Sequence, residues 1–74
     1  MASDLNTLCG EIVRLLRKEK GLSMQDLCGM IDIKITPQQL ALYETGKSRW
    51  PVDLLVQISD ALNVDIRVLI GRIT

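Results

Sequence analysis

Apolar residues recur at steps of three and four positions along the N-terminal part of the chain, which is the spacing of one face of an α-helix. These apolar positions are Leu5, Leu8, Cys9, Ile12, Leu15 and Leu16. Basic residues follow at 17, 18 and 20, where positive charge favours the C-terminal end of a helix. Gly21 then supplies the left-handed backbone conformation that commonly ends a helix. The pattern predicts an amphipathic helix over residues 5–20.

Capping residues mark the starts of two further helices. Ser23 is followed three positions later by Asp26, a spacing that resembles a capping box. Thr36 places a capping hydroxyl directly before Pro37, and proline suits the first helical position because an N–H there has no helical partner. Gly46 ends the third predicted helix. The residues that these two helices would turn toward a core are Leu27, Cys28, Ile31, Leu40 and Tyr43.

The C-terminal part of the chain predicts two more helices, over residues 52–62 and 66–70. Asn63 can end the first of them and Asp65 can cap the second. A short strand is the local alternative between the second and third helices, because apolar residues alternate there at Ile31, Ile33 and Ile35. The helical spacing on both sides outweighs this short alternation. The sequence therefore predicts an all-α fold, a compact bundle of five short helices.

Length and composition narrow the functional classes. The chain has 74 residues, which predicts a single domain over 1–74 with its core in 5–70. It has no histidine, the commonest general base and metal ligand, and its two cysteines are too few for a zinc site. No apolar stretch approaches the ~18 residues of a membrane span, and no signal-peptide pattern is visible. We expect a cytoplasmic protein that is not an enzyme and has no cofactor, metal or membrane partner.

Charge is balanced over the whole chain but not along it. Residues 14–49 contain seven basic and four acidic side chains, and the remaining residues contain two basic and five acidic ones. A neutral protein with a basic middle can still present one face to phosphate. The zero total gives little support for non-specific nucleic-acid binding, which depends on the number of cations.

Several short motifs together resemble a phage-repressor-like DNA-binding domain of the Cro or Xre type. They are IVR at 12–14, GLS at 21–23, DLC at 26–28, TPQQL at 36–40, YETGK at 43–47 and LVQISDALNV at 55–64. The resemblance implies a lambda-repressor-like fold whose second and third helices form a helix-turn-helix. The chain departs from the family pattern at Met24, where glutamine is usual and Gln25 comes one position later. Its connection at 32–35 is also longer than usual.

The resemblance implies that the outward face of the third helix lies in the major groove of double-stranded DNA. The residues that it assigns to base contacts are Thr36, Pro37, Gln38, Gln39, Ala41 and Leu42. Gln38 can form a bidentate pair with adenine, whereas Ala41 and Leu42 can contact only thymine methyl groups. The alternative for the two glutamines is a solvated helix face.

The expected phosphate contacts lie on either side of this helix. They are Ser23 and Gln25 at the start of the second helix, and Lys47, Ser48 and Arg49 in the loop after the third. Further candidates are Arg17, Lys18 and Lys34.

The fourth helix and the C-terminal residues carry more apolar side chains than one core face needs. For the core, Val52, Leu55, Ile58, Ser59 and Leu62 suffice. The surplus, which also includes Val56, predicts a homodimer interface at Leu54, Ala61, Ile66, Ile70 and Ile73. A homodimer would place two recognition helices one turn of DNA apart, ~34 Å, and so predicts a palindromic operator. The alternative is that these residues close the core.

Four other residues have structural interpretations. Cys9 and Cys28 lie on apolar faces and are expected to be buried thiols without a redox role. Glu44 is expected to anchor the loop that follows it. Trp50 is expected to cover the core, with a dimer contact or a place on the DNA backbone as alternatives.

The function that the sequence predicts is a sequence-specific DNA-binding transcriptional regulator of bacterial or phage origin. The simplest mode is a homodimeric repressor that occupies a promoter, with RNA polymerase or a second protein as a further candidate partner. The alternative is a protein-interaction module of the same fold that does not read DNA. The zero net charge, Met24 and the longer connection favour that alternative.

Overall fold

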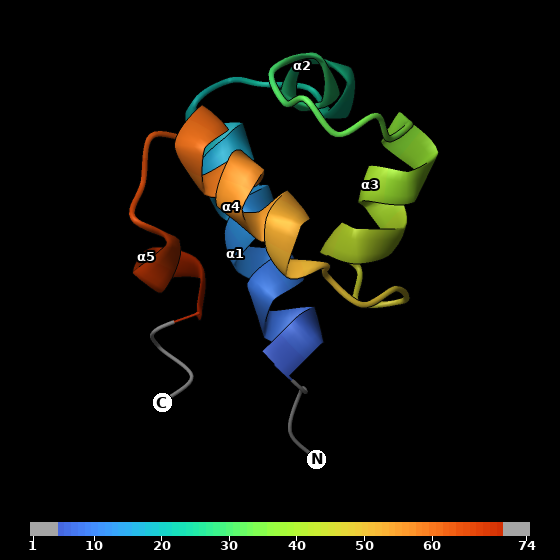
Figure 1. Ribbon diagram of the computed structural model, residues 1–74, viewed down its shortest axis with the longest axis vertical. Coiled ribbons are helices and arrows are strands. Elements are labelled where there is room, and N and C mark those ends of the chain that lie inside the picture. Colours follow the sequence, from blue (N-terminus) through green and yellow to red (C-terminus); the bar gives the residue numbers. More distant parts are fainter. Residues whose placement is uncertain (1–4, 71–74) are drawn as a thin grey trace.

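A computed structural model of the chain describes residues 5–70, which form five helices and no strand. The helices are α1 (Leu5–Glu19), α2 (Met24–Gly29), α3 (Pro37–Glu44), α4 (Val52–Ala61) and α5 (Ile66–Ile70). α1 packs against both α3 and α5, while α2 contacts α3 and α4 contacts α5 (Figure 1). The all-α fold of five short helices that the sequence predicts is confirmed. The segment 31–35, for which a strand was the alternative, is an irregular connection.

Reciprocal capping boxes begin α2 and α3; the sequence predicts the one at Ser23, and at Thr36 it predicts the capping hydroxyl alone. The Ser23 hydroxyl accepts a hydrogen bond from the Asp26 N–H (3.0 Å), and the Asp26 carboxylate accepts one from the Ser23 N–H (3.0 Å). The Thr36 hydroxyl and the Gln39 side-chain carbonyl make the same exchange, at 3.1 and 3.0 Å. Each box satisfies two N–H groups that a helix start would otherwise leave unpaired.

Three residues in the left-handed region end helices where the sequence predicts an end. Gly21, Gly46 and Asn63 have φ angles of 70°, 80° and 59°. α2 is shorter than expected, because it ends at Gly29 and leaves Ile31 in the connection to α3. The boundaries of the other helices lie close to the predicted ones.

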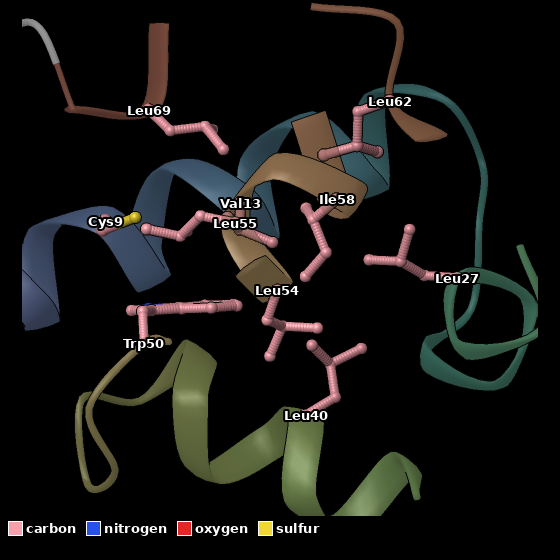
Figure 2. Packing of buried hydrophobic residues seen from close by; sticks show 10 residues of the cluster. All are labelled: Cys9, Val13, Leu27, Leu40, Trp50, Leu54, Leu55, Ile58, Leu62 and Leu69. Atoms are coloured by element: carbon pink, nitrogen blue, oxygen red, sulfur yellow. The ribbon is translucent and has the colours of Figure 1, made fainter. Parts of the chain in front are cut away.

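All five helices contribute to one hydrophobic core. Its buried members are Cys9, Val13, Leu27, Leu40, Trp50, Leu54, Leu55, Ile58, Leu62 and Leu69 (Figure 2). Trp50 extends from the loop after α3 toward the buried residues of α1 and α4, and its ring stacks on Tyr43 with centroids 5.1 Å apart. The expectation that Trp50 covers the core is therefore confirmed.

The buried face of α1 differs from the predicted one. Leu5 and Leu15 are 58% and 66% exposed, whereas Val13 is fully buried. The reason is the close approach of α3 at Gly10, where an added Cβ atom would lie 2.5 Å from the carbonyl oxygen of Glu44. Because only glycine allows this contact, α1 turns its small residue toward α3. Leu5 and Leu15 are left outside, whereas Cys9, Ile12 and Leu16 of the predicted face pack in or against the core.

The buried face of α4 also differs from the predicted one. Leu54, expected at a dimer interface, is 1% exposed and points toward Leu40 of α3 (Figure 2). Val52, expected in the core, is 70% exposed. The helix is covered on more than one side, since Leu54, Leu55 and Ile58 are all buried, so it needs more apolar residues than a helix with one packed face. The prediction that Leu54 contacts a second subunit is wrong.

Alkylation is expected to distinguish the two free cysteines. The thiolate is the reactive form of cysteine, and burial raises the pKa of the Cys9 thiol, which is 3% exposed, to about 11. Cys28 is half-buried, and burial, with a smaller contribution from the charge of Glu44, raises its pKa as well. Iodoacetamide should label Cys28 slowly in the native protein and Cys9 only after denaturation. Peptide mass spectrometry measures both, and equal labelling of the native protein would contradict the burial of Cys9.

Candidate nucleic-acid interface

α3 presents one face, with two glutamines and Leu42, to solvent and buries the opposite one. Thr36, Gln38, Gln39 and Leu42 are exposed, and Pro37 and Ala41 are half-buried. On the other side Leu40 is fully buried. The structure therefore brings all six residues predicted to contact bases to the start and outer side of this one helix.

Gln38 and Gln39 are neighbours with different hydrogen-bonding capacity. The Gln39 carbonyl oxygen accepts the Thr36 N–H in the capping box, so one of its two lone pairs is used and the amide group is held in that orientation. Gln38 makes no side-chain hydrogen bond within the described residues 5–70. Gln38 therefore has its whole amide group free for the donor and acceptor contacts of a bidentate pair with adenine, whereas the amide of Gln39 is held in the capping box.

The loop after α3 is fixed to α1 by a residue that the sequence analysis did not single out. The side-chain amide of Asn6 donates to the Ser48 carbonyl oxygen (2.6 Å), and its carbonyl oxygen accepts the Trp50 N–H (2.8 Å). The N–H groups of Lys47 and Ser48 donate to the Leu42 carbonyl at the end of α3 (2.9 and 3.2 Å). Hydrogen bonds to Asn6 of α1 and to Leu42 of α3 thus fix the conformation of the loop.

This loop carries two of the predicted phosphate contacts on its outer side. Lys47 and Arg49 are exposed, while Ser48 is half-buried and holds the loop through its backbone. Because the loop leaves α3 directly, its cations stay close to the helix whose outer face is polar. Lys18 and Lys34 are also exposed.

Arg17 and Glu44 form a buried ion pair between α1 and the end of α3. The Arg17 Nε and Nη2 atoms donate to the two carboxylate oxygens of Glu44 at 2.9 and 3.1 Å, and Nη1 donates to the Leu22 carbonyl (2.8 Å). The two side chains are 7% and 1% exposed. Arg17 is therefore not available to phosphate, and Glu44 connects α3 to α1 instead of anchoring its own loop.

The start of α2 is the other predicted phosphate site. Ser23 and Gln25 are exposed, but the Ser23 hydroxyl already accepts the Asp26 N–H. The backbone N–H of Ser23 and then its hydroxyl hold the pKa of the Asp26 carboxyl below its ordinary value. The stabilising effect of this carboxylate is present above its ordinary pKa and is lost as the pH falls through the lowered one. Met24, which replaces the usual glutamine, packs against the core.

A side chain of α4 holds the long connection between α2 and α3. The Gln57 carbonyl oxygen accepts the N–H groups of Asp32 and Ile33, at 2.8 and 2.9 Å. Between residues 31 and 35, no other backbone N–H donates a hydrogen bond within the part of the chain that the structure describes. Nothing in the spacing of the sequence indicates this contact, because the partners are 24 and 25 positions apart.

The remaining residues of the predicted dimer interface are only partly described. Ala61 and Ile66 are half-buried and pack against the core. Ile73 and the side chain of Ile70 lie outside the described residues.

Residues 5–70 contain no group of three or more cysteine, aspartate or glutamate side chains placed to hold a metal ion. Within the same range, no helix has the length and apolar character needed to cross a membrane.

Comparison with known proteins finds a matching family model and similar sequences. A family model described as helix-turn-helix matches residues 13–69. Two proteins named as uncharacterized HTH-type transcriptional regulators, from Rickettsia prowazekii and Rickettsia conorii, are each 40% identical to this chain over 62 residues, or 84% of it. The match covers 46% and 48% of these proteins, so the chain spans about half the length of the curated relatives it matches.

A solved structure has the same fold. The clp gene regulator ClgR from C. glutamicum superposes with a TM-score of 0.81, covering 99% of this chain and 97% of that one. The two sequences are 21% identical, so this likeness concerns the arrangement of the helices.

Proposed function

Because the chain belongs to the helix-turn-helix family, we propose that it is a sequence-specific DNA-binding transcriptional regulator that places α3 in the major groove. The observation that carries the proposal is the exposed amide of Gln38 near the start of α3, together with the exposed cations Lys47 and Arg49 of the loop that follows the same helix. An amide can recognise a base edge, and cations neutralise phosphates. The 40% identical relatives named as transcriptional regulators support the same function.

The proposed contacts divide into base reading and phosphate binding. Gln38 is the main base reader, and the other base contacts are Thr36, Pro37, Gln39, Ala41 and Leu42. Gln39 is the less free of the two glutamines, because its carbonyl oxygen is held in the capping box. The phosphate contacts are Ser23, Gln25, Lys47, Ser48 and Arg49. They fix the position of α3 on the duplex without reading sequence.

We further propose that two copies bind a palindromic operator and repress by occupying the promoter in the cytoplasm of a bacterial cell. A pair doubles the number of phosphate contacts, which a chain of zero net charge needs for affinity. The contact between the copies is proposed at Ala61, Ile66, Ile70 and Ile73. From an adjacent site the bound protein would also be able to touch RNA polymerase.

Selection from a random DNA pool tests this function directly. The protein is incubated with random duplexes at near-physiological salt, and the bound duplexes are sequenced. We expect enrichment of a palindrome whose half-sites lie about one helical turn apart. Enrichment of a single half-site would support sequence reading by a monomer and contradict the dimer. The absence of any enriched sequence from a folded, helical protein would contradict the DNA-reading function.

Gln38→Ala is expected to change sequence preference, whereas Lys47→Ala should weaken all binding. Loss of a bidentate base contact removes ~1–3 kcal/mol of discrimination at one half-site position. Loss of a phosphate contact lowers affinity for every sequence and reduces the salt slope by about one. Affinities for the selected duplex and its single-base variants, at three salt concentrations, measure both effects. A uniform loss with Gln38→Ala would contradict base reading by Gln38.

Charge reversal separates the DNA reader from a protein-interaction module of the same fold. The double variant K47E/R49E should lose operator affinity, because it turns two phosphate contacts into repulsions. An interaction module that reads no DNA would keep its protein partner after the same change. Circular dichroism is the control for folding, and both side chains are exposed, so we expect an unchanged helical spectrum.

A further inference from the structure

The orientation of α3 is defined at both of its ends by long-range polar contacts. At the C-terminal end, Glu44 is bound to Arg17 of α1. At the N-terminal end, α3 begins at Pro37, four residues after Ile33, whose N–H is held by Gln57 of α4. The helix with the polar outer face is therefore tied to the two central helices α1 and α4 (Figure 1).

The Gln57 contact is the directional restraint on the connection between α2 and α3. An amide oxygen has two lone pairs, so it can accept two consecutive backbone N–H groups at once. The isoleucines of the connection, Ile31, Ile33 and Ile35, also pack against the core. Apolar contacts are not directional, so they bury these side chains without defining the path of the backbone. Hydrogen bonds to Asp32 and Ile33 define that path.

We propose that Gln57 is a positioning residue for sequence reading: through the 31–36 connection it sets the orientation of α3 and thereby the affinity for the operator. This inference rests on the proposed DNA-binding function. A connection longer than usual in a helix-turn-helix allows α3 more orientations, and a tie to α4 removes that freedom before DNA is bound. Binding by the protein without this tie is weaker, because only part of the population has α3 in the competent orientation.

The test uses three variants of the whole chain. Q57L removes the acceptor at similar side-chain size, and Q57E keeps an oxygen acceptor for the two N–H groups. I58V removes one methyl group from the fully buried neighbour on the same helix, so it lowers stability while keeping the Gln57 side chain. Affinities are measured for the selected operator and for a scrambled duplex, at a temperature where circular dichroism shows all proteins folded.

For Q57L we expect about tenfold weaker operator binding, the order of effect for two lost hydrogen bonds. Affinity for the scrambled duplex should stay within about twofold, because the phosphate contacts of the loop after α3 remain. Amide exchange at Asp32 and Ile33 should become faster in Q57L only. Q57E and I58V should keep operator affinity within about threefold of the wild type.

The outcomes separate this inference from the function on which it rests. If the wild type shows no sequence preference, the DNA-reading function fails and the role of Gln57 fails with it. If the wild type reads sequence and Q57L reads it equally well, only the role of Gln57 is overturned. Equal losses in Q57L and I58V would overturn it too, because they would trace the effect to general stability.

Discussion

Glu44→Ala is expected to destabilise the domain by about 3–5 kcal/mol, the usual cost of removing one partner from a buried ion pair. Arg17 is held among α1, α3 and the Leu22 carbonyl, and its side chain is 7% exposed, so it would keep its charge without the carboxylate that balances it. Domains of this size have stabilities of only a few kcal/mol to about 10 kcal/mol. Urea unfolding followed by circular dichroism should therefore show a large fall in the midpoint, or an unfolded protein.

A double variant distinguishes the cost of the unpaired charge from the value of the pair itself. R17M/E44L replaces both charges with apolar side chains of similar length, and such replacements of buried pairs are often neutral or stabilising. We expect it to be clearly more stable than Glu44→Ala. A loss below about 1 kcal/mol in Glu44→Ala would indicate that water screens the pair as it screens a surface salt bridge.

Leu54→Ala is expected to destabilise the domain by about 2–5 kcal/mol, because it leaves a cavity in a core that the surrounding helices cannot fully close. Leu54 is 1% exposed and lies between α4 and Leu40 of α3, so the cavity would separate α3 from the rest of the core (Figure 2). Thermal unfolding of the dilute protein measures the change.

Val56→Ala on the same helix is the matched control. Val56 is 43% exposed, so its truncation should change stability only slightly. If Leu54→Ala changes the association state and leaves the stability of the monomer unaltered, Leu54 belongs to a subunit interface as the sequence analysis expected. If both variants lose stability equally, α4 is packed differently from the arrangement described here.

Local signals predicted the helix starts and ends well. The caps at Ser23 and Thr36 and the left-handed residues Gly21, Gly46 and Asn63 all lie where the sequence indicates them. Each of these features is a hydrogen bond or a backbone conformation that involves residues within one turn. Whether a cap or a left-handed residue forms therefore depends little on what packs against the helix.

Contacts between distant residues were not predicted. The Asn6 side chain is hydrogen-bonded to Ser48 and Trp50, which lie 42 and 44 positions further along the chain, and the Gln57 side chain is hydrogen-bonded to Asp32, which lies 25 positions before it. Nothing in the spacing around an amide side chain distinguishes one that holds a distant backbone from one that faces water. The ion pair of Arg17 with Glu44 was missed for the same reason, since each residue alone has the pattern of a surface charge.

The sequence by itself determined the all-α fold, the start of each helix and the outward face of α3, because helix periodicity and capping are local properties. Only the tertiary structure decided which stripes of α1 and α4 are buried, since both helices carry more apolar positions than one face. Which stripe is buried depends on the close approach of α3 to α1 at Gly10 and on the side chains that surround Leu54. Burial is a property of neighbours in space, and the spacing of residues along one helix does not contain it.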